Sequence, residues 1–333
     1  MKTKAIKRAR SITAITVMLI LCLLMFFISI NLGSIKVSFY DLLKGLFFEY
    51  DSNVATIYDL RFPRIIIALF AGAALSVSGV LLQAVLKNSL ADPGIIGISS
   101  GAQFVTVIIA AAFPALYSKV TIFSFLGGLF AFLVVYGLWI KNGYTSLKII
   151  LIGIAIEALF TGLSDAVNSF GGGTVSTVAA IVDGNITLKT WDDVRILLIF
   201  VIPALILSLF CAHYCDLLAL EDKTVRGLGL NVNLLQLLIS LVAVLLASSV
   251  TAVCGVVSFL GLLVPHIGRL IVGSGHKSLI PFSMFLGAFV FLTADTLGRT
   301  ICYPYEVSAA VLMNVIGGPV FIILLQRNGI KHG

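Results

Sequence analysis

The chain has 333 residues, of which 59% are hydrophobic and 11% are charged, with a mean hydropathy of +1.12 and a formal net charge of +7. Soluble domains carry roughly 25% charged residues, and this much apolar sequence cannot be buried inside one water-soluble core. The composition therefore excludes a soluble protein. It predicts an all-α polytopic membrane protein.

Ten apolar runs have about the length needed to cross a bilayer core of roughly 30 Å. The first follows the basic stretch MKTKAIKRAR and is too long for the apolar region of a signal peptide. The chain is expected to form a single transmembrane domain over 1–333, since no loop could house a soluble domain. The predicted spans are 12–32, 63–86, 94–113, 121–140, 147–168, 194–212, 233–253, 255–272, 279–298 and 307–326.

The basic residues support this count through the positive-inside rule. If both termini are cytoplasmic, eight basic residues fall on the outer side and the other fourteen of the 22 fall inside. The expected location is a bacterial cytoplasmic membrane, with the lipid bilayer as partner. The basic residues are scattered between apolar runs, so no nucleic acid is expected. The eight outer residues are Lys36, Lys44, Arg61, Arg64, Lys119, Lys189, Arg195 and Arg299.

Two outer arginines, Arg61 and Arg64, share one face at the start of the second span. Cations at a helix N-terminus oppose the macrodipole, at roughly 0.3 to 1 kcal/mol each, so something else should compensate. Two readings remain open: the side chains reach lipid phosphates, or they bind an acidic external partner. Arg299, at the end of the ninth span, has a favourable position in the helix dipole.

Carboxylates within predicted spans are candidate functional groups. Glu157 lies near the middle of the fifth span, where it either lines a pathway or pairs with a neighbouring helix. Asp165 lies two turns further out, and Asp295 lies near the outer end of the ninth span. These three acids allow an alternative function, in which the chain is an ion-coupled secondary transporter.

Two polar interruptions lie on the cytoplasmic side. The turn Lys87 to Pro93 separates spans two and three, and Pro93 is expected to open span three. The segment 213–232, here called the coupling segment, contains LALEDKTVRGLGL over 218–230. We predict two short helices there, joined at a turn formed by Gly227 and Gly229, lying across the membrane face as a docking element.

Some kinds of site are not expected. The sequence has no GxxxxGK[ST] phosphate loop, so the chain is expected neither to hydrolyse ATP nor to be an enzyme. It has no CxxC pair, so neither a bound metal nor a disulfide framework is indicated. In the run 254–273, Pro265 is expected to make a structural turn, and a proton relay through the adjacent His266 is the alternative.

Ordered motifs give the chain a resemblance to a known family. LRFPR, SGVLLQAVLKNSLADPGIIGISSGA, LALEDKTVRGLGL, GVVSFLGLLVPHIGRLIVG, GAFVFLTADTLGR and LMNVIGGPVFIILL follow one another as in the FecCD-like permeases. These are the membrane subunits of type II ABC importers for iron siderophores, haem and cobalamin. The chain departs from the family at Ser89, Ser308 and Ala310, where the family usually has Pro, Pro and Gly, and in 181–185, where it usually has WxxGS.

The resemblance implies a ten-helix permease that acts as a homodimer with two ATPase subunits and an external substrate-binding protein. It implies that ATP and Mg bind the ATPase and that this chain binds no cofactor. The implied cargo is an iron complex, with a ferric siderophore first, haem second and cobalamin third.

The resemblance also assigns roles by position. It implies that Arg61, Arg64 and Arg299 bind the substrate-binding protein, and that Asn88, Leu90, Thr145 and Ser146 narrow the cytoplasmic exit, with Glu157 as a further pathway candidate. The residues implied to contact the ATPase are Leu218, Leu220, Glu221, Asp222, Arg226, Gly227, Leu228 and Gly229.

Overall fold

The computed structural model describes residues 2–32, 52–141, 146–170, 186–187, 189–301 and 305–329, and these residues form helices, turns and irregular segments with no strand. The helices, in chain order, are α1 (Lys2–Asn31), α3 (Ser52–Leu60), α4 (Phe62–Val85), α5 (Ile98–Ala112), η1 (Pro114–Lys119), α6 (Val120–Lys141), α7 (Ser146–Phe170), α9 (Trp191–Leu218), α10 (Asp222–Gly227), α11 (Val232–Cys254), α12 (Leu260–Val272), α13 (His276–Thr300) and α14 (Ala309–Gly329).

All ten predicted spans correspond to helices in the structure. Among the described residues, seven helical segments are long and apolar enough to cross a membrane. The predicted spans 94–113 and 255–272 correspond to the shorter apolar helices α5 and α12, and the span 307–326 corresponds to α14. At 1.5 Å per residue, the 15 residues of α5 and the 13 of α12 do not reach across a core of about 30 Å.

Several predicted boundaries were wrong. The third span was expected from residue 94, but Gly97 caps α5 with φ +84°, so Pro93 lies in the preceding turn. The eighth was expected from residue 255, but α12 begins at Leu260. Pro265 lies inside α12, so the structural turn expected at Pro265 instead lies at 255–259.

The sixth span also differs, because α9 continues six residues past its predicted end and reaches Leu218. Cys215 and Leu218 are fully buried, so the last turns of this helix pack against the bundle despite their polar neighbours. The coupling segment therefore contains one short helix, α10, and not the two that were predicted.

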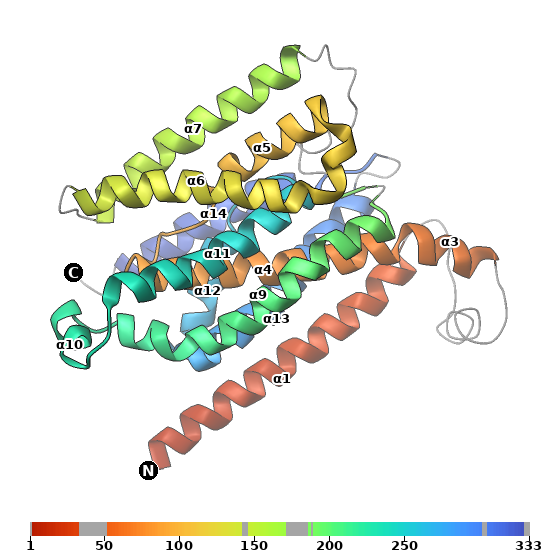
Figure 1. The fold of residues 1–333 in the computed structure, drawn as a ribbon. Helices are drawn as coiled ribbons and strands as arrows, with labels where there is room; N and C mark the ends of the chain where they lie inside the picture. The colour runs from red at the N-terminus through yellow and green to blue at the C-terminus, as the bar shows by residue number, and fades with distance from the viewer. Residues whose placement is uncertain are drawn as a thin grey trace.

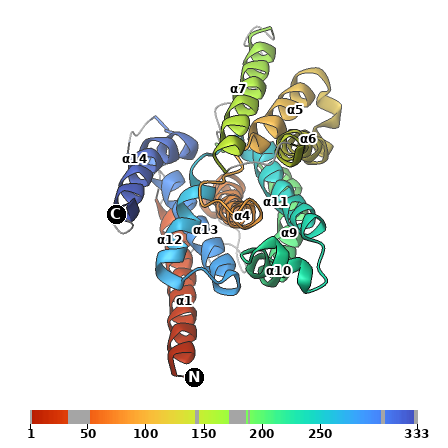
Figure 2. The same cartoon turned by 90° about the vertical axis from the view of Figure 1, so that its left-hand side faces the viewer.

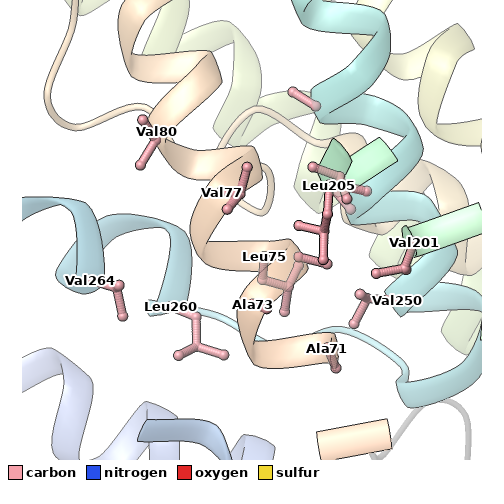
Figure 3. Close-up of a cluster of buried hydrophobic side chains, with 14 of the residues drawn as sticks. Ala71, Ala73, Leu75, Val77, Val80, Val201, Leu205, Val250, Leu260 and Val264 are labelled. Carbon is pink, nitrogen blue, oxygen red and sulfur yellow. The ribbon is translucent and has the colours of Figure 1, made fainter. Parts of the chain in front are cut away.

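Helix α4 lies at the centre of the bundle, surrounded by α9, α11, α12 and α13 (Figure 2). Its apolar side chains interdigitate with those of its neighbours, as Leu75 and Val77 do beside Leu205 and Leu260 (Figure 3). By contrast, the spans in α1 and α7 are mostly exposed, and their apolar side chains are available to lipid or to another subunit.

Small residues allow α4 to touch its neighbours backbone to backbone, as the sequence predicted. A Cβ at Gly72 would collide with the carbonyl of Gly287 on α13, and a Cβ at Gly79 would collide with the carbonyl of Gly261 on α12. Such contacts are the usual way in which membrane helices pack without a hydrophobic driving force between them. They fix α4, α12 and α13 closely together.

The two ends of the bundle carry different elements (Figure 1). The start of α1, the end of α14 and α10 lie toward one end, and α3 lies at the other. An even number of crossings requires both termini to share a side, and the arrangement agrees with this. Following the orientation expected from the sequence, the end that carries α10 is called the inner end below, and the end that carries α3 the outer end.

Candidate functional site

The coupling segment presents an exposed short helix at the inner end. α10 is anchored by Val225, which is fully buried, and it ends at Gly227, after which Gly229 takes a left-handed conformation with φ +80°. Asp222 lies in its first turn and Arg226 in its last, so both charges suit the helix dipole. The predicted turn is confirmed.

Most predicted contact residues of this segment face outward. Leu220 and Leu228 are 43% and 59% exposed, whereas Leu218 is fully buried and supports the segment from beneath. A shallow hollow of about 490 Å³ lies beside α10. The other exposed members of the predicted set are Glu221, Asp222, Arg226, Gly227 and Gly229.

The irregular segment 86–97, here called the gate segment, joins α4 to α5 at the inner end. Its second residue, Lys87, has a left-handed φ of +49°, and the backbone N–H of Asn88 donates to the carbonyl of Gln83 at 3.1 Å. This is the bond that closes a Schellman motif, where the left-handed residue is usually glycine. A lysine there costs roughly 1 to 2 kcal/mol.

The gate segment is held by side chains as well. The Asn88 Oδ1 accepts from the backbone N–H of Leu90 at 2.9 Å, and the Gln83 Nε2 donates to the carbonyls of Ala91 and Gly261 at 3.2 and 3.0 Å. Asn88 and Leu90, the two predicted exit residues here, therefore share one compact turn. Of the other two, Thr145 lies outside the described residues, and Ser146 opens α7.

Asp92 is a buried carboxyl in the same segment. Its Oδ1 accepts from the backbone N–H of Gly94 at 2.8 Å. Burial raises the pKa of Asp92 to about 6, against the lowering effect of the backbone hydrogen bonds from Gly94 and Ile95.

A polar cavity of about 690 Å³ lies where α5, α12 and α14 begin. Gly94, Ser258 and Glu306 line it from the irregular segments that precede α5, α12 and α14. Irregular backbone is tolerated at membrane depth only where it is buried in protein or lines a water-filled space. The cavity is therefore consistent with the short lengths of α5 and α12.

Glu157 faces this cavity. It lines the wall from α7 together with Thr161 and Asp165. Of the two readings left open by the sequence, the structure favours the one in which Glu157 lines a pathway, because none of the hydrogen bonds found among the described residues pairs it with a neighbouring helix. Whether it acts in gating stays a prediction.

At the outer end, the compensation expected for Arg64 comes from inside the chain. Its guanidinium is 7% exposed, donates from Nε to the Asp295 carboxylate at 2.9 Å, and lies 2.7 Å from Glu306. Asp295 is fully buried and lies 3.4 Å from Arg299, which also donates to the Ser29 hydroxyl at 2.7 Å. Arg64 and Arg299 thus join α4, α13 and α1.

Arg61 is placed differently from these two arginines. It precedes α4 as its N-cap residue, is partly exposed, and donates to the carbonyl of Ile30 at 2.8 Å. The three predicted docking arginines therefore lie near one another at the outer end, but two of them are buried in ion pairs. Sequence reasoning missed Asp295 and Glu306 as their partners, because these acids are 231 and 242 residues away in the chain.

The model of the FecCD transport family matches residues 21–327. The chain belongs to the FecCD transport family. It is also 40% identical, over 94% of its length and 98% of theirs, to the IsdF proteins of Staphylococcus aureus strains MSSA476 and MW2, which are named as haem-iron transport system permeases.

Solved structures agree with this assignment. A metal-chelate type ABC transporter in an inward-facing conformation is similar with a TM-score of 0.80 and 27% identity, covering 94% of this chain and 98% of that one. PsaBC from Streptococcus pneumoniae, in complex with a Fab, shares the fold with a TM-score of 0.59 and 20% identity, over 86% of this chain and 95% of that one. The fold is therefore that of a type II ABC importer permease, and the chain is a multi-pass protein of the bacterial membrane.

Proposed function

We propose that this chain is the membrane-spanning permease of an ATP-driven importer for an iron complex. The observation that carries the proposal is the layout of one chain in the FecCD transport family: a polar cavity between helices, lined in part by Gly94 of the gate segment, with an exposed short helix beside that segment. Such a layout suits a pathway whose inner exit is controlled by a partner that binds outside the membrane.

The inner partner in this proposal is a pair of ATPase subunits that bind ATP and Mg, while this chain itself binds no cofactor. Support comes from the exposed residues of α10 and from the hollow beside it, which together offer both charged and apolar contacts. Both termini and α10 would then be cytoplasmic. This orientation agrees with the excess of basic residues at that end.

A second copy of the chain completes the proposed pathway. The cavity wall comes from α5, α7, α14 and three irregular segments, and the apolar flank of α7 is largely exposed, with Leu151 and Leu159 both more than half exposed. A homodimer would cover such flanks and enclose the cavity between two equivalent walls.

An external binding protein would deliver the cargo at the outer end. Among the three outer arginines, the partly exposed Arg61 is the best placed to contact carboxylates of the binding protein. Arg64 and Arg299 stabilise the surrounding surface through their ion pairs with Asp295. We expect the change Arg61→Glu to weaken docking at low salt, where exposed charges interact most strongly. Unchanged affinity of the purified binding protein at low salt would contradict this role.

For the cargo, we propose haem first and a ferric siderophore second. The similarity to permeases that are named for haem-iron transport supports this order, which reverses the order implied by the motifs alone. The experiment is uptake of haem into proteoliposomes that contain the permease, its ATPase and its binding protein, with and without ATP. Uptake that proceeds without ATP and follows an ion gradient would overturn the importer proposal in favour of a secondary transporter.

A further inference from the structure

Lys87 connects the gate segment to the coupling segment. Its ammonium donates to the carbonyl of Leu220 at 2.7 Å and lies 2.8 Å from the Asp222 carboxylate, at the start of α10. Among the described residues, every hydrogen bond found between these two segments comes from this ammonium. Lys87 is therefore the direct polar connection between them.

The position of Lys87 is maintained at a cost in backbone conformation. It occupies the left-handed site that closes the end of α4, where glycine would be unstrained. Strained residues of this kind cluster at functional sites. Here the left-handed turn brings a long cationic side chain to the C-terminal end of α9, where the free carbonyls attract a cation.

The contact is unsuited to a purely structural role. The Lys87 and Asp222 side chains are 38% and 51% exposed, and exposed ion pairs add little to stability. On the gate side, however, Lys87 directly precedes the hydrogen-bonded turn of Asn88, Leu90 and Ala91. A shift of the Lys87 backbone would therefore move that turn as one unit.

We propose that Lys87 is a positioning residue that carries movement of α10 to the gate segment, so that closure of the ATPase partners changes the inner exit of the cavity. The inference rests on the proposed function and adds the residue through which the coupling passes. Lys87 acts on Asn88 and Leu90 through its own backbone and contacts no cargo. Its loss should uncouple ATP hydrolysis from transport and leave hydrolysis itself largely intact.

The test uses the complete importer in proteoliposomes, with haem as the transported probe, and measures haem taken up per ATP hydrolysed. Lys87→Met removes the ammonium, and Lys87→Gly removes it while relieving the left-handed strain, so it controls for misfolding. Both should lower the ratio roughly three- to tenfold, within the range by which mutations in a coupled network alter coupling. Lys87→Arg should keep at least half of the ratio, because it retains a cation of similar reach.

Two further variants sharpen the result. Lys277→Met removes an exposed lysine of the first turn of α13 and should leave the ratio unchanged. The double change Lys87→Asp with Asp222→Lys should restore part of the haem-to-ATP ratio that is lost by Lys87→Asp alone.

Three results would overturn the proposal. Lys87→Gly could show the same haem-to-ATP ratio as the wild type, or Lys87→Arg could lower the ratio as much as Lys87→Met does. ATP hydrolysis could also fall in parallel with uptake, which would indicate a role in ATPase docking. Absence of ATP-dependent uptake in the wild type would instead overturn the proposed function.

Discussion

A buried aspartate lies near each end of α4, and the two are stabilised in different ways. Asp295, at the outer end, is contacted by the guanidinium groups of Arg64 and Arg299. Asp92, at the inner end, accepts hydrogen bonds from the backbone, and none of its hydrogen bonds or ion pairs among the described residues involves a cation. The outer end is therefore held by buried ion pairs, and the inner end by interactions that cost less to rearrange. The difference suits a permease whose inner exit moves more than its outer rim.

The change Asp295→Ala should have the largest effect. It would leave two buried guanidinium groups without their shared carboxylate, which typically costs roughly 3 to 5 kcal/mol. We expect a clear loss of folded protein in denaturant titration of the purified permease. The control is Asp192→Ala, which breaks an ion pair between exposed side chains on α9 and should change the unfolding free energy by less than about 0.5 kcal/mol. Equal losses of unfolding free energy in Asp295→Ala and Asp192→Ala would contradict the proposed role of the outer ion pairs.

The change Asp92→Asn tests the inner aspartate through pH. Because burial raises the folded pKa of Asp92 to about 6 from its ordinary 3.8, its stabilising contribution is complete below pH 3.8 and is lost as the pH rises through 6. Asparagine keeps an oxygen for the Gly94 N–H and has no charge to bury. The variant should therefore unfold at a higher temperature than the wild type at pH 7.5, with a gain of roughly 1 to 3 kcal/mol.

At pH 5 the advantage of Asp92→Asn should fall to roughly half, because the folded wild-type carboxyl is then mostly protonated while the unfolded one, with its ordinary pKa of 3.8, is still mostly ionised. Thermal unfolding measured at both pH values gives the comparison directly. A difference between variant and wild type that is the same at pH 5 and pH 7.5 would show that Asp92 does not titrate in this range.

The change Glu306→Gln should be milder than Asp295→Ala, although both acids contact Arg64. The Glu306 side chain is 41% exposed, so its ion pair is partly screened and should contribute about 1 kcal/mol or less. Burial alone would raise the pKa of Glu306, but the hydrogen bonds from Arg64 and Thr187 and the nearby arginine charges lower it overall. Its contribution is therefore present above pH 4.5 and is lost as the pH falls through the lowered pKa. A larger loss of unfolding free energy in Glu306→Gln than in Asp295→Ala, measured by denaturant titration, would contradict this expectation.

The change Glu157→Gln should have the smallest effect on transport. Its carboxylate lines the cavity between the two ends of α4 and takes no part in the ion pairs of either end. We expect haem uptake to stay ATP-dependent and to change by less than about threefold, since a single mutation away from coupled elements seldom shifts coupling further. Loss of uptake with ATP hydrolysis intact would instead support proton or ion coupling through this residue.

The sequence predicted what depends on local composition. Ten apolar runs, the break at Gly227 and Gly229, and the need for a counter-charge near Arg64 all follow from hydropathy, backbone freedom and the helix dipole. The sequence could not identify Asp295 as the counter-charge, because that pairing depends on α4 and α13 packing side by side. The starts of α5 and α12 were also misplaced, since apolar residues that line a cavity in irregular backbone have the same hydropathy as helical ones.

Lys87 was the least predictable residue of the inner end. Within the turn Lys87 to Pro93 it reads as an ordinary solvated lysine, and only the left-handed backbone and the position of Leu220 reveal its contact. Glu157 was better indicated, because an acid in the middle of an apolar span is unusual. Its orientation toward the cavity still required the structure.

The glycine contacts of α4 limit where the permease can bend. With the backbone of Gly72 against Gly287 and that of Gly79 against Gly261, α4 meets α13 and α12 at backbone contacts that oppose sliding, so the three helices form one stiff block. Any alternation of access must then be absorbed at the non-helical joints 86–97 and 255–259, which flank that block. The distance between spin labels on α4 and α13 should accordingly stay constant through the ATP cycle. The distance between labels on α4 and α5 should change, because the joint 86–97 lies between these two helices.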